Sequence, residues 1–122
     1  MKGLTEAVKS VMEIDGAVGA AIGDANSGMM LAAEGGNTTM NLEVACAGNA
    51  EVIRSKNRVK ADLKIKDKIE DIMITLDSQY HILRPIEHTE SLFFYVVLNR
   101  QRANLAMARH RLASIEKGVV AA

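Results

Sequence analysis

The side chains that could carry nucleophilic, redox or metal chemistry in this sequence are few and far apart. The single cysteine, Cys46, lies far along the chain from the three histidines, His81, His88 and His110. The histidines lack the spacing of a helical zinc motif, and one cysteine forms neither an internal disulfide nor a thiolate metal site. We therefore expect no catalytic residue, no metal ligand and no cofactor. We interpret each histidine as a surface or hydrogen-bonded residue and Cys46 as an apolar side chain in a helix interface.

Two other patterns that can support catalysis are also weak here. The adjacent carboxylates Glu70 and Asp71 show no identifiable arrangement for general acid and base catalysis, so we interpret them as solvated charge. The glycines Gly16, Gly19 and Gly23 are not followed by the Gly-Lys-Ser/Thr ending of a phosphate-binding loop, and we interpret them as sites of close packing. No nucleotide site is expected in this chain, and the protein is not expected to be an enzyme.

A basic segment is the strongest local charge pattern. It holds seven cations, Arg54, Lys56, Arg58, Lys60, Lys64, Lys66 and Lys68. Cations are favoured at the end of a helix because they interact with its dipole, and this is the preferred interpretation. An acidic protein partner and a nucleic-acid patch are the alternatives, and the role of the segment stays open. The chain as a whole has 15 cationic and 15 acidic residues, so no overall field draws it to nucleic acid.

Length and composition predict one domain, residues 1–122, with an aliphatic core. The chain has 122 residues, no Trp, two Tyr and two Phe, and 48% of its residues are hydrophobic. The apolar residues occur in short runs rather than in a span of about 20, so no membrane insertion is expected. The first residues meet Lys and Glu without a continuous apolar stretch, which does not resemble a secretory signal. We expect a cytoplasmic protein.

Periodicity along the chain predicts three helices and five strands. Helical spacing is found over residues 4–12 and 40–60, and again over an apolar stripe from Leu105 to Ile115. Asn99 is expected to cap this last helix and Gly118 to end it. Alternation or short apolar runs predict the strands, which are residues 17–23, 29–33, 69–76, 80–86 and 92–98. The run 92–98 is continuously apolar and is therefore expected to be a central strand, covered on both faces. Pro85 is expected near a strand end because it cannot donate to a sheet ladder.

The resulting order is α-β-β-α-β-β-β-α, which defines an α+β fold. Consecutive strands joined by short turns favour a largely antiparallel sheet, with helices on both of its faces.

This order, together with several segments, resembles the roadblock/LC7 family over essentially the whole chain. Residues 14–20 look like the family's junction between first helix and first strand, and residues 24–32 look like its first hairpin. Residues 80–86 and 92–98 resemble its fourth and fifth strands, and Asn104-Leu105 falls at the start of its last helix. The resemblance implies profilin-like layers, with strand order 2-1-5-4-3. It also implies that the first and last helices share one face and that the middle helix covers the other.

The resemblance further implies dimers in which third strands pair and middle helices pack together. The middle helix supports this independently, because it carries two apolar rows, which are Leu42, Cys46, Asn49 and Ile53, and Met40, Val44 and Ala47. That surface is wider than one sheet face requires, and the small residues 45–50 allow another backbone to approach. The alternative is a monomer whose helix packs tightly on its own sheet. The expected interface residues are Leu42, Ala45, Cys46, Asn49, Ile53, Ile72 and Ile74.

For function, the resemblance implies a non-catalytic, dimeric regulator or scaffold that binds a small Ras-like GTPase in a bacterial signalling or polarity system. The alternative is a structural adaptor of a motor or trafficking assembly, whose binding ignores the nucleotide state. An enzyme based on Cys46 and the histidines is a distant third hypothesis. Whether a partner is activated, inhibited or only held stays open, as does the choice between homodimer and heterodimer.

Overall fold

The structure, a computed structural model, describes residues 3–36 and 40–119 and contains one five-stranded antiparallel sheet. Its elements in chain order are α1 (Leu4–Met12), β1 (Ala17–Asp24), β2 (Met30–Gly35), α2 (Leu42–Asp62), β3 (Ile72–Thr75), β4 (Gln79–Pro85), β5 (Leu92–Asn99) and α3 (Leu105–Lys117). The strands lie in the order β2-β1-β5-β4-β3 and every neighbouring pair is antiparallel. The predicted element order and sheet order are confirmed.

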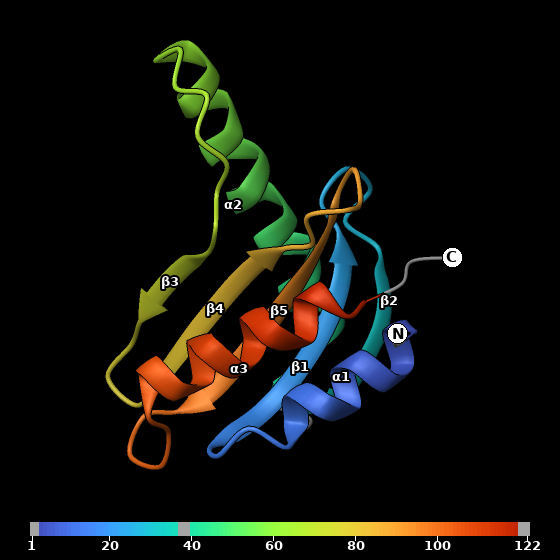
Figure 1. Ribbon diagram of the computed structural model, residues 1–122, viewed down its shortest axis with the longest axis vertical. Helices are drawn as coiled ribbons and strands as arrows, with labels where there is room; N and C mark the ends of the chain where they lie inside the picture. Colours follow the sequence, from blue (N-terminus) through green and yellow to red (C-terminus); the bar gives the residue numbers. More distant parts are fainter. Residues whose placement is uncertain (1–2, 37–39, 120–122) are drawn as a thin grey trace.

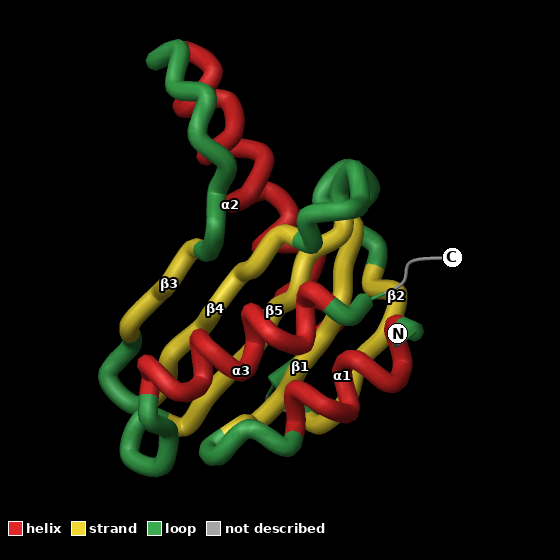
Figure 2. The backbone as a smooth tube through the Cα atoms, viewed as in Figure 1, coloured by secondary structure: helices red, strands yellow, loops and turns green. Residues whose placement is uncertain are grey.

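The helices cover opposite faces of this sheet. Figure 1 shows α1 and α3 side by side across one face, while α2 passes behind the sheet, and Figure 2 shows the same three layers. Strand β5 is the centre of this arrangement, since residues 93–98 are all buried. Phe94, Val96 and Leu98 pack in the core under α1 and α3, and the alternate residues Phe93 and Tyr95 pack under α2. The prediction of a central strand covered on both faces is confirmed.

The ends of two helices differ from the sequence-based expectation. Helix α2 begins at Leu42 rather than at residue 40, because the side chain of Asn41 accepts a hydrogen bond from the Val44 backbone N–H and caps the helix. Helix α3 is capped by Asn104 rather than by Asn99. The side chain of Asn99 instead accepts a hydrogen bond in the turn after β5.

Strand β3 is shorter than the predicted strand 69–76. Only Ile72–Thr75 pairs with β4, opposite residues 80–83. The carboxylate of Asp71, directly before the strand, accepts two hydrogen bonds from the Arg109 guanidinium on α3, at 3.0 and 3.2 Å. In the register of this pair Glu70 would lie opposite Pro85, which ends β4 and has no backbone N–H to donate to a ladder.

Helix α2 continues well past the sheet. It has 21 residues and therefore spans about 30 Å, but its buried residues end at Ile53. Figure 1 shows the remaining turns extending beyond the sheet, with the following segment returning alongside them to β3. None of the described helices is long and apolar enough to cross a membrane.

Gly35, at the end of β2, provides a test of how closely β2 packs against Met12 of α1 and Val18 of β1. It has φ +73°, and a Cβ there would lie 2.6 Å from Met12 Cε and 2.7 Å from the Val18 carbonyl oxygen. The left-handed conformation costs an L-residue roughly 1–2 kcal/mol, and the contact with a backbone oxygen adds to this. We expect Gly35→Ala to lower the free energy of unfolding, measured with urea, by at least about 1 kcal/mol.

Gly118→Ala is the matched control for this measurement. Gly118 has φ −91°, and its added Cβ would meet its nearest neighbour at an ordinary 3.6 Å. An equal loss of stability in the two variants would contradict the packing described at the end of β2.

Candidate protein-binding surface

The inner face of α2 is occupied by the sheet of the same chain. Three of the predicted interface residues, Leu42, Cys46 and Ile53, are at most 6% exposed. They pack in a cluster with Leu83, Phe93, Tyr95 and Val97. The sheet of the same chain therefore covers these three side chains, and their packing holds α2 against it.

The other predicted interface residues lie at the margins of this packing. Ala45 and Asn49 are half-buried on the flank of α2, and Ile72 and Ile74 are half-buried on β3. Because the two isoleucines are two residues apart on a strand, they share a sheet face, and Ile72 packs on the α2 side. Strand β3 is an edge of the sheet, so half of its backbone hydrogen-bonding groups point away from β4. Among the described residues, no strand pairs with this outer edge.

The solvent-facing side of α2 carries a second row that the predicted interface set left out. We define the outer stripe as Val44, Gly48, Val52, Ser55 and Val59. The three valines are 38–69% exposed, and a Cβ at Gly48 would meet no atom within 4 Å. The last four members line a shallow depression. Their spacing of four, three and four residues is typical of a helix that packs against another helix.

A signal for the outer stripe was present in the sequence. The spacing of Gly48, Val52, Ser55 and Val59 is helical, and Val44 already stood in the second apolar row. Periodicity alone did not show which of the two rows faces the sheet.

A polar cluster lies between α2 and the sheet. The Tyr95 hydroxyl is 3.2 Å from His81 Nδ1, and His81 Nε2 is 2.9 Å from Gln79 Oε1. Burial lowers the pKa of His81, so its imidazole is neutral at pH 7. Burial raises the pKa of Tyr95, the neighbouring Cys46 raises it further, and a hydrogen bond with Asn49 acts in the opposite direction. The cluster therefore holds uncharged groups.

Cys46 lies in the same layer and is unsuited to nucleophilic or redox chemistry. Its side chain is fully buried, and burial raises the pKa of its thiol to about 11. The thiolate, which is the reactive form, is therefore scarce at neutral pH. His88 and His110 are exposed, and His110 stands on α3, across the sheet from Cys46. Among the described residues, Cys46 and these two exposed histidines do not form one site.

A network of charges joins α3 to the sheet at one end of the molecule. Arg84 Nε donates to Glu116 Oε1 at 3.1 Å, and both residues are buried. The second Glu116 oxygen accepts the Glu87 backbone N–H at 3.3 Å, and Arg84 Nη1 lies 3.7 Å from Asp71. The sequence analysis did not identify Glu116, although its position, four residues after Leu112, places it on the buried side of α3.

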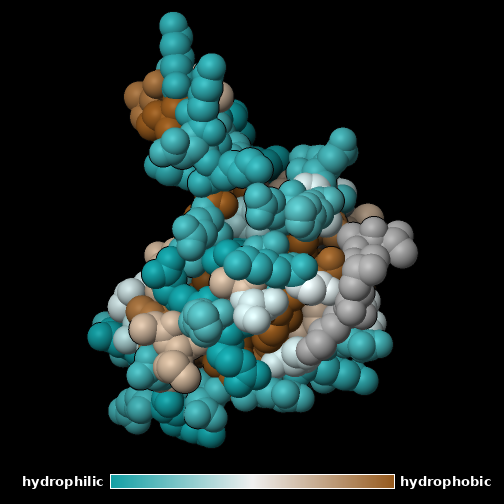
Figure 3. All heavy atoms as spheres, in the orientation of Figure 1, coloured by the Kyte–Doolittle hydropathy of each residue, from teal (hydrophilic) through white to brown (hydrophobic). Residues whose placement is uncertain are grey.

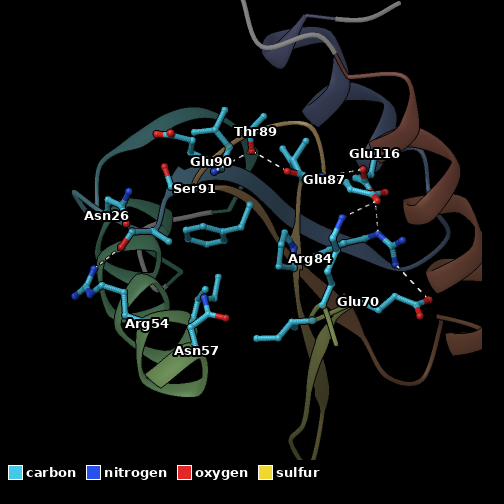
Figure 4. A pocket seen from close by; sticks show the side chains of 18 of the residues that line it. Asn26, Arg54, Asn57, Glu70, Arg84, Glu87, Thr89, Glu90, Ser91 and Glu116 are labelled. Carbon is cyan, nitrogen blue, oxygen red and sulfur yellow. Dashed lines mark hydrogen bonds and ion pairs between the residues drawn. The ribbon is translucent and has the colours of Figure 1, made fainter. Parts of the chain in front are cut away.

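This network borders a hollow of about 610 Å³. Figure 4 shows Arg54 and Asn57 of α2 on one side, Arg84, Glu70 and Glu116 on another, and Thr89, Glu90 and Ser91 above. Its walls carry both cations and acids, and the Arg54 guanidinium contacts the Ala25 carbonyl oxygen. Among the described residues, no group of three His, Cys, Asp or Glu side chains is arranged to hold a metal ion. On its wall the Ser91 hydroxyl donates a hydrogen bond to Asp24 Oδ1 at 2.7 Å, and the Asn26 backbone N–H donates to the same oxygen. These two hydrogen bonds lower the pKa of Asp24, which makes its carboxylate a weak base.

Comparison with solved protein structures identifies the type of fold. No family model and no curated protein sequence matches the chain. A roadblock/LC7 domain from Streptomyces avermitilis matches with TM-score 0.81 and 11% identity, covering 95% of this chain and 93% of that one. The chain has a roadblock/LC7-type fold. Myxococcus xanthus MglB matches with TM-score 0.81 and 10% identity, covering 93% and 89% of the two chains.

A further match is to MglB in a tetrameric arrangement, with TM-score 0.68, 15% identity and coverage of 92% and 86%. Sequence identities this low show the roadblock fold alone.

The half-buried imidazole of His81 leads to a prediction about pH. In the unfolded chain His81 binds a proton near its ordinary pKa of 6.5, whereas in the folded chain it does so only at lower pH. Between these values the unfolded state holds more protons, so the free energy of unfolding falls as the pH drops through this window. We expect His81→Gln to reduce the loss of stability between about pH 7 and pH 5, measured as denaturation midpoints.

The exposed His110→Gln variant is the control and is expected to keep the wild-type dependence on pH. If His81→Gln kept it as well, the burial of the imidazole would not be the cause of the loss.

Proposed function

We propose that this chain is a non-catalytic, dimeric regulatory module that binds a small Ras-like GTPase in the cytoplasm. The single observation that carries the proposal is the roadblock-type fold, which matches MglB structures over about nine-tenths of the chain. The GTPase follows from what the roadblock resemblance implies. The inert cysteine and the scattered histidines support a binding role rather than a catalytic one.

The dimer is supported by two unsatisfied surfaces on the α2 side. The outer stripe leaves three valines exposed, and the edge of β3 leaves backbone groups without a strand partner among the described residues. A second copy related by a two-fold axis would cover both with the same surfaces on each subunit. In this arrangement Ala45 and Asn49 flank the helix contact, and Ile72 and Ile74 flank the strand contact.

The regulatory action would arise from a difference in affinity. A partner that binds one nucleotide state of a GTPase more tightly shifts the GTPase toward that state, and a partner with equal affinity for both states shifts nothing. In this mechanism the chain supplies a paired, rigid surface, and the hydrolysis chemistry belongs to the GTPase. We assign no catalytic residue and no arginine finger to this chain.

Val52→Asp tests the dimer. Val52 is 38% exposed in the single chain, so the folded monomer is expected to accept a carboxylate there. In a dimer the new charge would be buried without a partner, which costs several kcal/mol. We expect light scattering after size-exclusion chromatography to show a dimer for the wild type and a monomer for this variant.

Ala61→Asp adds the same charge to an exposed position of the same helix, outside the outer stripe, and is expected to remain dimeric. A wild-type protein that is monomeric at micromolar concentrations, or a Val52→Asp variant that stays dimeric, would contradict the proposed interface.

Titration with candidate GTPases tests the regulatory role. Each small GTPase encoded in the same organism is loaded with GDP or with a non-hydrolysable GTP analogue, and binding to the wild-type chain is measured by calorimetry. We expect one GTPase to bind with dissociation constants that differ at least about tenfold between the two states, which corresponds to about 1.4 kcal/mol. Absence of any complex would refute the proposal, and equal affinities would favour the nucleotide-independent adaptor.

A further inference from the structure

The end of α2 and the segment after it form a strongly charged projection. We define the basic tip as residues 56–66, which contain one acid, Asp62, and the cations Lys56, Arg58, Lys60, Lys64 and Lys66. Apart from Lys60, every residue of the tip is exposed. Figure 1 shows this part of α2 beyond the sheet, and Figure 3 shows it as hydrophilic atoms around a small hydrophobic group.

Ion pairs among the described residues do not neutralise the charge of the basic tip. Lys56, Lys64 and Lys66 form no ion pair with any acidic group in the described parts, residues 3–36 and 40–119. The Arg58 guanidinium donates to the Ser55 hydroxyl at 3.2 Å, and the Lys60 ammonium contacts the Asp67 carbonyl oxygen. Neither contact removes a charge. An anionic surface would therefore find these cations available.

Two aliphatic side chains stand at the extreme end of this projection. Leu63 is 63% exposed and Ile65 is 45% exposed. Between them Lys64 adopts the left-handed conformation, with φ 57°, and the Ile65 N–H donates to the Lys60 carbonyl at 3.0 Å. This is the hydrogen bond of a Schellman helix end, which reverses the chain. The turn thus presents apolar side chains next to Lys64 and Lys66.

We propose that the basic tip binds the surface of an anionic membrane peripherally. Each Lys or Arg near an anionic lipid surface contributes roughly 1 kcal/mol, and aliphatic side chains can enter the headgroup region. The composition of the tip favours lipid over protein, because protein interfaces are enriched in aromatic residues and Arg and depleted in Lys. Four of its five cations are Lys, and it has no aromatic residue. A nucleic-acid strand would likewise find no aromatic side chain to stack on.

This inference goes beyond the GTPase proposal and does not depend on it. In a dimer the same surface would be present twice, which would strengthen attachment wherever both tips reach one membrane.

Vesicle co-sedimentation of the full chain tests the proposal. Phosphatidylcholine vesicles are compared with vesicles that also contain about 30% phosphatidylglycerol. The protein is expected to sediment with the anionic vesicles only, and less at high salt because the charges are screened. The triple variant Lys56→Gln, Lys64→Gln and Lys66→Gln is expected to bind at least tenfold more weakly, and Leu63→Ser with Ile65→Ser is expected to lose the binding that survives salt.

A matched control removes the same charge elsewhere. Arg102, Arg111 and Lys117 are exposed and lie on the α3 side of the molecule. Their triple change to Gln is expected to leave vesicle binding within about twofold of the wild type. Because all substituted positions are exposed, each variant is expected to retain the wild-type circular dichroism spectrum.

Several results would overturn the proposal. These are no sedimentation with anionic vesicles, equal sedimentation with neutral vesicles, or an equal loss in the two triple variants. Binding to duplex DNA or to an acidic protein in place of vesicles would overturn it as well. GTPase titration of the basic-tip variant keeps the two proposals separate, since each can fail while the other holds.

Discussion

Strand β5 needs to exclude water from both of its faces, and the other layers of the molecule follow from this requirement. Six consecutive residues, 93–98, are buried, so neither face tolerates solvent. Burying apolar surface stabilises the fold by roughly 25 cal/mol per Å². Both faces of a strand contribute this stabilisation only when helices cover both. Helices α1 and α3 meet the face of Phe94 and Val96, and α2 meets the face of Phe93 and Tyr95. The sheet order places β5 between β1 and β4, which keeps it away from both edges.

Covering one face of this strand uses only the first part of α2. The inner row of the helix ends at Ile53, beyond which no residue of the helix is buried. An isolated helix in water gains little from its own hydrogen bonds, so an extension of this kind carries mainly side chains that interact with something else. Besides its buried inner row, the helix carries two chemically distinct surfaces. The outer stripe is small and aliphatic and faces away from the sheet, whereas the basic tip is charged and lies at the far end. One helix therefore serves the core, a candidate helix contact and a candidate charged contact.

The sequence predicted most of the fold because the strands and helices differ clearly in hydrophobic period. The sequence-based prediction was wrong where two residues could play the same role, or where the outcome depended on a residue far away in the sequence. Asn99 and Asn104 are equally good caps, and only the turn after β5 selects the second. The predicted strand 69–76 pairs only over Ile72–Thr75, because its register with β4 places Glu70 opposite Pro85, which cannot donate to a ladder. On α2 both apolar rows were visible, but which one meets the sheet depends on packing against Phe93 and Tyr95 rather than on the helix itself.

The same reasoning explains how a chain only 10–11% identical to two solved structures can share their fold with TM-scores of 0.81. The fold requires a doubly covered central strand, hairpins on either side, and helices with one apolar row each, and many residue combinations satisfy these demands. These demands of the fold do not restrict surface side chains, since a substitution at an exposed position changes stability little. The exposed valines of α2 and the cations of its end are therefore not explained by the needs of the core. Cys46 is fully buried and the His81 imidazole is half-buried and neutral, so contacts made by the surface of this chain are the place to test its activity.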